Sequence, residues 1–287
     1  MSSSARKGII LAAGLGTRLM PLTKTFSKHF LNIYNKPMIF YPLTTLMSLK
    51  IRDILVISDK ENLKPYQKLL RNGRHLGIKI SYKVQKKPNG IAEALIIGKK
   101  FLKGNACALI LGDNLLFGKD ITIPLRKANL SDHSSILTVN KENPEKFGVL
   151  SKFKNKLKII EKPKKFISNK VVIGLYFFDK FAPSIASNLN KSKRGELEIT
   201  DLNNIYLKKK QMNVINLNKN TFWLDAGNFD DLFVANKIIM KKETKNYDII
   251  GSPELEAYKN KWINKMKFKS VIKKYKNQYG LMLKKKV

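Results

Sequence analysis

Two glycines and a group of basic residues near the start of the chain have the types and the spacing of a phosphate-binding loop. An apolar run ends at Gly14. Gly16 stands two positions after Gly14, and Arg18 stands two positions after Gly16. Glycines let backbone N–H groups approach an anion closely, and a fixed cation completes the site. Because a G-x-G pair also suits a tight strand–helix turn, the prediction depends on the further cations Lys24 and Lys28.

Two common phosphate loops are excluded by the residues that follow. The dinucleotide fingerprint needs a third glycine three positions after Gly16, where Leu19 stands. The P-loop needs Gly-Lys-Ser or Gly-Lys-Thr, and neither tripeptide follows. The sequence therefore predicts a nucleotide or phosphate loop of another kind, with Arg18 as part of it.

Two aspartates that follow apolar runs are candidate metal ligands. Asp113 comes after Gly112 at the end of one run, and Asp225 ends another. Ligands of open α/β sheets bind at the carboxyl ends of strands, and Mg²⁺ takes one or two carboxylates together with water and substrate phosphates. Either aspartate alone could be a helix cap or turn residue. Together with the glycine loop, they predict a magnesium site at Asp113 and Asp225.

A third group of polar residues could bind a sugar phosphate. Glu161 and Lys162 precede Pro163, which ends the strand before it. A carboxylate can accept hydrogen bonds from sugar hydroxyls, and a lysine can hold a phosphate, although the two could also form a surface ion pair. Arg194 is a second candidate phosphate ligand, in a polar stretch that opens a helix and whose acidic residues also suit the helix N-terminus.

Alternating strands and helices are predicted to position these residues. In the first half, the expected strands are Lys7–Leu11, Asp53–Ser58, Ile78–Val84 and Ala106–Leu111. Three of them are rich in Ile, Leu and Val, as strands covered on both faces are. The segments between them have apolar residues at helical spacing: Met38–Lys50, Asn62–Leu70 and Gly90–Phe101. This alternation predicts a parallel sheet with helices on both sides.

The second half is more mixed, and no repeat or linker divides the chain. The expected strands are Ser135–Val139, Val149–Phe153, Leu157–Glu161 and Val171–Phe178, and the expected helices are Ile199–Lys209 and Asp230–Lys245. Beyond residue 246 the pattern is helical and basic. We therefore predict an α/β domain over residues 1–245, with a mixed, mostly parallel central sheet flanked by helices, and a C-terminal helical appendage over residues 246–287.

Composition excludes several classes of protein. The chain has 287 residues, of which 43% are hydrophobic, so a sizeable core is possible. A single cysteine, Cys107, excludes a disulfide framework and a multi-cysteine zinc site, and its apolar neighbours predict a buried thiol. The three histidines lack metal-ligand spacing. The chain has no apolar run of membrane-spanning length, so we expect no membrane partner and a reducing, cytoplasmic location.

The net charge of +35 comes from 56 basic and 21 acidic side chains. Such a charge is compatible with nucleic-acid binding. The lysines, however, are spread along the chain, and no basic motif with interleaved aromatic residues stands out. A solvated, lysine-rich surface without a specific nucleic-acid partner is the favoured interpretation.

In their order along the chain, these motifs resemble those of the sugar-1-phosphate nucleotidylyltransferases, and within them the thymidylyltransferases. The resemblance spans nearly the whole chain. Its blocks are Leu11 to Leu19, Pro21 to Lys24, Ser27-Lys28, Asn35 to Ile39, Val84-Gln85, Gly90 to Ala92, Leu111 to Asn114, Phe147 to Val149, Glu161 to Pro163, Gly174 to Phe177, Arg194 to Asp201 and Trp223 to Gly227. It implies a Rossmann-like nucleotidyltransferase fold.

The resemblance also implies a reaction: dTTP and glucose 1-phosphate give dTDP-glucose and pyrophosphate, with Mg²⁺. A sugar phosphate is already an anionic nucleophile near pH 7, because the second pKa of a phosphate monoester is about 6. Such an enzyme needs no general base. It must align the substrates and neutralise charge during in-line attack at the α-phosphorus.

Roles for individual residues follow from the same resemblance. The implied catalytic residues are Arg18, Lys28, Asp113 and Lys162. Those implied for the nucleotide are Leu11, Gly14, Gly16, Thr17, Arg18, Lys28, Asp113, and Gln85 and Gly90 at the base. Those implied for the sugar phosphate are Gly148, Glu161, Lys162, Val172 and Arg194. A homotetramer inhibited by a downstream dTDP-sugar is implied as well.

Five positions depart from the family pattern, and three alternative functions are compatible with the sequence. Family members usually carry Gly, Gln, Asp, Tyr and Thr where this chain has Ala13, His29, Asn35, Phe147 and Ala226. UTP could replace dTTP, or another sugar 1-phosphate could replace glucose 1-phosphate. A nucleotide-sugar-binding protein without turnover is a second alternative, and a polyanion-binding surface protein is a third.

Overall fold

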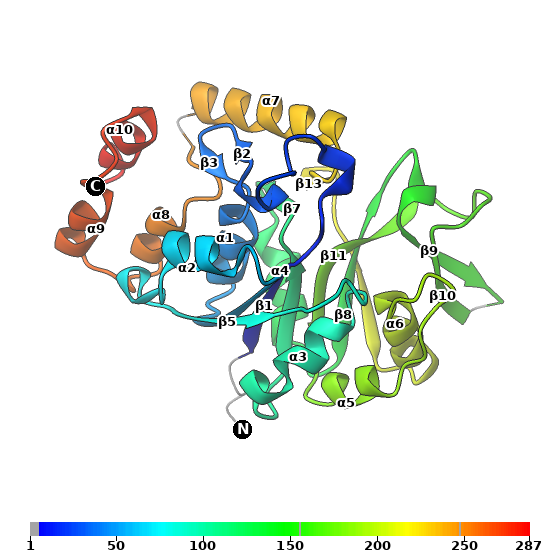
Figure 1. Ribbon diagram of the computed structural model, residues 1–287. Coiled ribbons are helices and arrows are strands. Elements are labelled where there is room, and N and C mark those ends of the chain that lie inside the picture. Colours follow the sequence, from blue (N-terminus) through cyan, green and yellow to red (C-terminus); the bar gives the residue numbers. More distant parts are fainter. Residues whose placement is uncertain (1–5, 155, 247) are drawn as a thin grey trace.

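A nine-stranded mixed sheet forms the centre of the computed structural model, which describes residues 6–154, 156–246 and 248–287 (Figure 1). Its strands are β1 (Lys7–Ala12), β4 (Asp53–Ser58), β5 (Lys79–Val84), β6 (Cys107–Leu111), β8 (Ser134–Asn140), β9 (Gly148–Phe153), β10 (Lys156–Glu161), β11 (Lys170–Phe178) and β12 (Met212–Asn216). Seven follow the order β10-β9-β11-β6-β1-β4-β5, and β8 pairs with β11 and β12. All eight strands listed as expected from the sequence are present, within one or two residues of the predicted ends.

The parallel part of the sheet places the candidate loops side by side. β1 lies between β4 and β6, with Leu11 opposite both Ile57 and Leu111. The strands therefore end at one edge, and the chain leaves β1 and β6 at neighbouring points: the backbone N–H of Gly112 donates to the carbonyl of Leu11 at 2.9 Å. β11 runs antiparallel to β6, β8 and β9. The predicted α/β fold with a mixed central sheet is confirmed.

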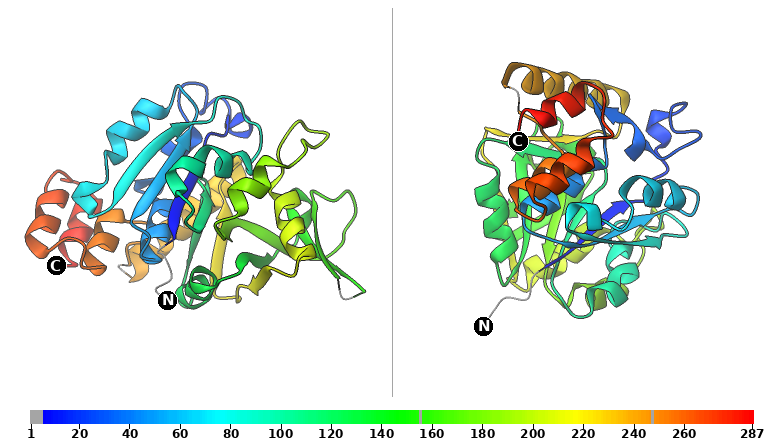
Figure 2. Two further views of the ribbon diagram at one scale, coloured as in Figure 1. Left: turned by 90° about the horizontal axis from the view of Figure 1, so that it is seen from below. Right: turned by 90° about the vertical axis from the view of Figure 1, so that its left-hand side faces the viewer.

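Helices cover both faces of this sheet (Figure 2). They are α1 (Phe40–Ser48), α2 (Leu63–Leu70), α3 (Glu93–Leu102), α4 (Thr122–Leu130), α5 (Ala182–Ser187) and α6 (Ile199–Lys208). Successive strand residues point to opposite faces. Ile10 accordingly packs in the buried cluster that includes residues of α1, α2 and α4, and Ile9 packs in the cluster that includes residues of α3, α5 and α6. Burial on both faces explains why these strands are continuous apolar runs.

Two short antiparallel ribbons lie outside the central sheet. One pairs β2 (Asn32–Ile33) with β3 (Lys36–Pro37), and the other pairs β7 (Asn114–Gly118) with β13 (Thr221–Asp225). Asp225 is the last residue of β13, which agrees with its expected place at a strand end, but β13 lies outside the central sheet. β13 instead pairs with β7, and this register sets Asp225 opposite Asn114. The ribbon thus brings Asp225 beside Asp113 from outside the sheet.

Four helices complete the chain: α7 (Phe229–Asn246), α8 (Pro253–Lys259), α9 (Lys265–Ile272) and α10 (Gln278–Lys284). The last three form the predicted C-terminal helical segment (orange to red in Figure 1). α8 packs against α1, and Leu255, Phe268 and Leu283 belong to the same buried cluster as Ile10. The segment therefore shares the core of the α/β part. The division of the chain at residues 245 and 246 stays a prediction.

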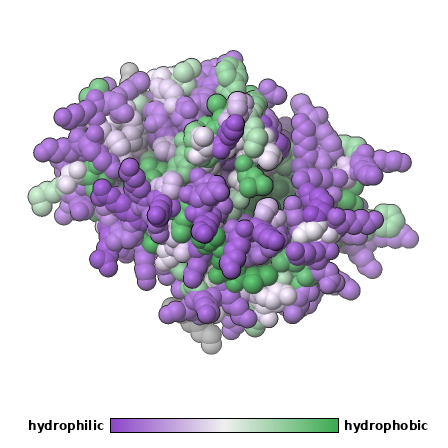
Figure 3. Space-filling view, viewed as in Figure 1, coloured by the Kyte–Doolittle hydropathy of each residue, from purple (hydrophilic) through white to green (hydrophobic). Residues whose placement is uncertain are grey.

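Hydrophilic side chains are spread over the face of the molecule seen in Figure 3, as expected for a solvated, lysine-rich surface. Cys107 is buried, as its apolar neighbours predicted. Within the described ranges, no helix has the length and apolarity needed to cross a bilayer.

Candidate active site

The glycine loop after β1 folds back toward Lys28. Gly16 has a φ of 65° and precedes a short 3₁₀ turn over Thr17–Leu19, and the Thr23 hydroxyl donates to the Gly16 carbonyl at 2.7 Å. A Cβ on Gly14 would lie 3.9 Å from Nζ of Lys28. The left-handed conformation at Gly16 is one that glycine adopts without steric cost. The predicted loop residues and Lys28 are thus brought together.

Asp113 is buried and held from both sides. One carboxylate oxygen forms an ion pair with Nζ of Lys28, and the other accepts a hydrogen bond from the Asn114 side chain at 3.1 Å. The backbone N–H of Ala226 donates to the Asp113 carbonyl at 3.1 Å. This last bond joins the end of β13 to the end of β6. It explains how Asp225, 112 positions later in the numbering, comes to lie next to Asp113.

Asp225 has the opposite environment. Its Oδ1 is buried and has no hydrogen-bond partner among the described residues. Burial, with the neighbouring charge of Asp113, raises the pKa of Asp225 from 3.8 to about 7. Burial also acts to raise the pKa of Asp113, but the Lys28 ammonium outweighs it and holds that pKa well below its usual range. Since like charges disfavour each other, the ionised Asp113 opposes the ionisation of Asp225.

These two carboxylates fit a divalent cation. An unpartnered, buried carboxylate oxygen with a raised pKa is costly for the folded protein, and a cation is the group that would relieve this cost. Carboxylate oxygens are the protein ligands that Mg²⁺ prefers. Asp225 could supply a free oxygen, while Asp113 would share its charge between the cation and Lys28.

Arg18 lies on the other side of Asp225. A Cβ on Gly227 would be 2.6 Å from Nη2 of Arg18 and 3.0 Å from Oδ1 of Asp225. The absence of a side chain at Gly227 therefore leaves room for the guanidinium to approach. Gly227 belongs to one of the sequence motifs, but the sequence did not indicate this role, because the role depends on a side chain from the other end of the chain.

His29 is a packing residue of this site. It is 2% exposed, and its Nδ1 lies 2.8 Å from the Ser27 hydroxyl and 3.0 Å from the Tyr66 hydroxyl. A Cβ on Gly112 would be 2.6 Å from the ring, so glycine is needed at that position. Burial, with the adjacent Lys28 charge, lowers the pKa of His29 from 6.5 to about 3. The ring is therefore neutral near pH 7.

The buried neutral ring makes stability sensitive to acid. A lowered folded-state pKa stabilises the protein above pH 6.5, and this contribution is lost as the pH falls toward 3. We expect the free energy of unfolding of the wild type to fall by roughly 2–3 kcal/mol more than that of His29→Gln between pH 7 and 4.5. Urea unfolding at both pH values measures this. His133→Gln, at an exposed position, is the control, and its free energy of unfolding should fall between the two pH values as much as that of the wild type. An equal fall in all three proteins would contradict the prediction.

Gln85 and Gly90 lie together beyond the end of β5. Gln85 is 5% exposed, and its Nε2 donates to the Gly90 carbonyl at 3.2 Å. Gly90 has a φ of 102°, and a Cβ there would be 2.4 Å from the Leu197 carbonyl oxygen. The predicted base-contacting pair is thus preformed, against the segment that precedes α6.

The residues predicted for the sugar phosphate form a second cluster. Glu161 is opposite Gly148 in the β9–β10 pair. Its carboxylate accepts from the Thr200 hydroxyl at 2.6 Å and lies 3.5 Å from Nη2 of Arg194. Lys162 follows with a φ of 43°, a conformation that is uncommon for a lysine and that clusters at functional sites.

Arg194 is held by a neighbouring carboxylate, and Val172 packs in the core. Arg194 lies in the turn before α6, and it binds the carboxylate of Glu198 at 2.8 Å, so the acidic residues of this stretch hold the arginine. Val172 is buried, packed in the cluster that contains Leu150 and Ile159. Leu11 is partly buried at the end of β1.

Asn114 holds Asp113 against the neighbouring strands, and the sequence did not indicate this role. Its Oδ1 accepts from Nε1 of Trp223 at 2.7 Å and from the backbone of Gly174 at 3.0 Å, while its amide nitrogen holds Asp113. It joins β6, β7, β11 and β13 at one point. Its position directly after Asp113, in a strand-end motif, was the available signal.

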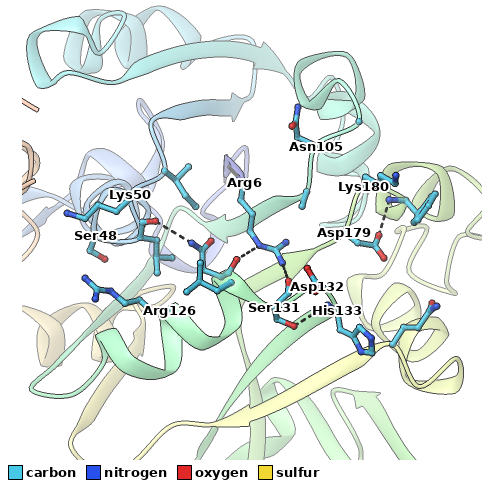
Figure 4. Close-up of a pocket in the computed structure, with 18 residues that line it drawn as sticks. Arg6, Ser48, Lys50, Asn105, Arg126, Ser131, Asp132, His133, Asp179 and Lys180 are labelled. Atoms are coloured by element: carbon cyan, nitrogen blue, oxygen red, sulfur yellow. Dashed lines mark hydrogen bonds between the residues drawn. The ribbon is translucent and has the colours of Figure 1, made fainter. Parts of the chain in front are cut away.

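A large cavity lies at the opposite edge of the sheet, where the parallel strands begin. It has a volume of about 1000 Å³, and Arg6 points into its wall (Figure 4). The Arg6 guanidinium donates to the carbonyls of Asn129, Ser131 and Phe178 at 2.6–2.7 Å, which caps the end of α4. The predicted site residues lie at the other edge, so this cavity is separate from them.

Comparisons with known proteins agree with this geometry. Residues 7–242 match the nucleotidyl transferase family. A glucose-1-phosphate thymidylyltransferase of Neisseria meningitidis is 41% identical over 281 residues, which is 96% of this chain and 98% of the relative. One of Mycobacterium tuberculosis is 40% identical over 260 residues, 90% of each chain.

Solved structures show the same fold. The crystal structure of a Bacillus anthracis protein assigned as a glucose-1-phosphate thymidylyltransferase, in complex with a sucrose, has a TM-score of 0.75 and 37% identity, covering 82% of this chain and 95% of that one. A UDP-glucose pyrophosphorylase complexed with UDP-glucose has a TM-score of 0.73 and 25% identity, covering 83% of this chain and 100% of that one. The fold, the clustered site and these matches establish that the chain belongs to the nucleotidyl transferase family.

Proposed function

We propose that this protein transfers a thymidylyl group from dTTP to glucose 1-phosphate, giving dTDP-glucose and pyrophosphate. The observation that carries the proposal is the grouping of Lys28, Asp113, Asp225 and Arg18 at one edge of the sheet, within a chain about 40% identical to enzymes named for this reaction. In the reaction, a phosphate oxygen of the sugar phosphate attacks the α-phosphorus of dTTP. The bond from that phosphorus to the bridging oxygen breaks, and pyrophosphate leaves with the electron pair.

The roles of the nucleotide-side residues follow from charge. Lys28 and Arg18 neutralise the triphosphate, and Arg18 in particular meets the charge that develops on the leaving pyrophosphate. Leu11, Gly14, Gly16 and Thr17 form the loop that receives the phosphates. A magnesium ion held by Asp113 and Asp225 would supply positive charge at the reacting phosphate. No side chain has to remove a proton, which agrees with the neutral, buried state of His29.

The roles of the sugar-side residues follow from the second cluster. Glu161 faces Gly148 and is held by Thr200, so its carboxylate is fixed where it can accept from sugar hydroxyls. Lys162 and Arg194 provide cations for the sugar phosphate, and Val172, whose side chain is buried, is assigned to the same group.

The direct test is pyrophosphate release across four nucleoside triphosphates and several sugar 1-phosphates, with and without Mg²⁺. We expect the highest kcat/KM with dTTP and glucose 1-phosphate. A clear preference for CTP or GTP would contradict the nucleotide assignment. Release with no pair of substrates would overturn the enzyme assignment and favour a nucleotide-sugar-binding protein.

Gly227→Ala tests the placement of Arg18. The added methyl group would occupy the space 2.6 Å from Nη2 of Arg18. Because the guanidinium end can move, we expect kcat to fall about ten- to a hundredfold with little change in Tm. Steady-state kinetics and thermal melting measure both. In an Arg18→Ala background the same substitution should cause a smaller loss of kcat, because only its contact with Oδ1 of Asp225, at 3.0 Å, remains; an equal loss there would contradict the assigned contact with Arg18.

We also propose a homotetramer inhibited by a dTDP-sugar. A second cavity of about 670 Å³ supports the regulatory part, since its lining has four lysines against two acidic residues, a balance that suits a diphosphate: Lys119, Lys242, Lys259 and Lys286 with Asp248 and Glu256. It lies beside Gly118, at the end of the β7–β13 ribbon far from Asp225. Light scattering measures the molar mass and so tests the homotetramer. Inhibition kinetics with dTDP-rhamnose test the separate site: raising the dTTP concentration should not relieve the inhibition.

A further inference from the structure

The side-chain amide of Gln85 is held in one orientation. Its Nε2 donates to the Gly90 carbonyl at 3.2 Å and to Oε2 of Glu93 at 2.7 Å. A carbonyl and an ionised carboxylate can only accept hydrogen bonds. Both hydrogens of the amide nitrogen are therefore used within the protein, and the reversed orientation would set the Gln85 oxygen against two acceptors. The carbonyl oxygen of Gln85 is left as the group that a ligand can contact.

Glu93 is itself fixed. It is the first residue of α3, where the helix dipole favours a negative charge. Its second oxygen, Oε1, accepts from the Asn89 side chain at 2.8 Å. The bond with Gln85 is thus one of two that the carboxylate accepts, and it is a charge-assisted one.

The second acceptor, the Gly90 carbonyl, is fixed by the backbone around it. The Leu197 N–H donates to the Asn89 carbonyl at 2.7 Å, and the Ala92 N–H donates to the Leu197 carbonyl at 3.2 Å. These bonds flank Gly90 on both sides. Gln85 therefore meets two acceptors whose positions are set before any ligand arrives.

We propose that Glu93 is a positioning residue that sets the base preference of the nucleotide site by keeping the Gln85 carbonyl oxygen toward the base. The proposal rests on the proposed function, in which Gln85 faces the base. Thymine and uracil present an N3–H donor on the edge used for pairing, whereas cytosine presents an acceptor at N3. An acceptor-only Gln85 accepts from N3–H of the first two bases, whereas at N3 of the third it meets another acceptor, and the base has to shift before Gln85 can accept from its N4 amino group. The substrate class is then nucleotides with a thymine or uracil base, and cytosine nucleotides are rejected.

The test is the ratio of kcat/KM for dTTP to that for dCTP, with glucose 1-phosphate as the second substrate. Glu93→Leu removes the charged acceptor, so the Gln85 amide can turn and present its N–H to cytosine N3. We expect the ratio to fall about tenfold or more. Calorimetric titration of dTTP and dCTP should show the same shift in the ratio of Kd values.

A matched variant separates this role from a packing role. In Glu93→Gln the new side chain can still accept a hydrogen bond from Gln85 through its oxygen. Its new amide nitrogen faces Asn89, which is half-exposed and can turn its own amide to accept from it. The ratio should therefore stay within about threefold of the wild type. In a Gln85→Ala background, Glu93→Leu should not change the ratio further, because Glu93 acts through Gln85. Asn89→Ala removes the hydrogen bond that holds one oxygen of Glu93, so the ratio should fall a few-fold. This variant replaces Glu93→Leu in the test if Glu93→Leu does not fold.

The outcomes separate the two proposals. A wild-type preference for dTTP that persists in Glu93→Leu and Asn89→Ala would overturn the positioning role alone. So would equal losses for dTTP and dCTP, since these indicate a structural role only. A wild-type protein that binds neither nucleotide would overturn the proposed function and this inference with it.

Discussion

Asp225→Asn is expected to lower kcat by a hundredfold or more while making the metal-free protein more stable at pH 8. The loss of activity follows because the variant removes one of the two charges proposed to hold the metal at the reacting phosphate. The gain in stability follows because the carboxylate is ionised at pH 8 although its Oδ1 is buried with no hydrogen-bond partner in residues 6–154, 156–246 and 248–287. A residue that costs stability and supplies activity is typical of a functional site.

The sign of the pH dependence is set by the raised pKa. Asp225 titrates near 7 in the folded protein and ordinarily at 3.8, so its contribution to stability is complete below pH 4 and is lost as the pH rises through 7. Asparagine cannot ionise and should avoid this loss. Without metal, we therefore expect the variant to gain about 2–4 kcal/mol over the wild type at pH 8, and little at pH 4.

Urea unfolding with a chelator at the two pH values measures the stability, and pyrophosphate release with saturating Mg²⁺ measures the activity. The exposed Asp230→Asn, at the start of α7, is the control, and its effect on stability should stay within about 0.5 kcal/mol. Added Mg²⁺ should stabilise the wild type more than Asp225→Asn. Near-normal turnover in Asp225→Asn, or equal stabilisation of both proteins by Mg²⁺, would show that Asp225 is not a metal ligand.

Lys28→Met is expected to destabilise the folded protein by about 3–5 kcal/mol near neutral pH and to lower kcat at least a hundredfold. Lys28 is 9% exposed, and its ammonium is the direct ionic partner of the buried Asp113. Without it, two adjoining carboxylates lack their nearest cation. The activity falls because the same cation is assigned to the nucleotide phosphates.

The cause of this destabilisation can be separated from lost packing. Methionine keeps most of the side-chain volume, so the loss should come from charge. If so, the double variant Lys28→Met with Asp113→Asn should recover most of the stability, and the single variant should recover part of it toward pH 5, where the carboxylates take up a proton. The exposed Lys24→Met is the control for stability. A double variant no more stable than the single one would contradict the electrostatic explanation.

The strands could be predicted because their signals are local. Continuous apolar runs such as Asp53–Ser58 show burial on both faces of a sheet, and the structure places that strand at the predicted residues. Elements with weaker local patterns were not predicted, including β7, β12, α4 and α5. β7 is formed by pairing with β13, more than 100 residues later in the chain, and no local pattern reports such a partner.

Most candidate site residues could also be predicted, but their surroundings could not. The sequence indicated Arg18, Lys28, Asp113 and Asp225 as a phosphate and metal set, and these residues lie together. It did not indicate that Asp113 would be ion-paired to Lys28 while Oδ1 of Asp225 lacks a hydrogen-bond partner within the described part of the chain. That difference depends on a few ångströms of side-chain placement, which the order of residues does not report.

The sequence by itself determined the α/β class, the order of the strands along the chain, and the candidate residues for binding a phosphate, a metal and a sugar. These depend on composition and on short spacings, which are properties of neighbouring residues. Only the tertiary structure decided that a ribbon outside the main sheet brings Asp225 to Asp113, that Gly227 makes room for Arg18, and that Glu93 orients Gln85. These depend on contacts between segments far apart in the chain, whose geometry is set by how the whole core packs.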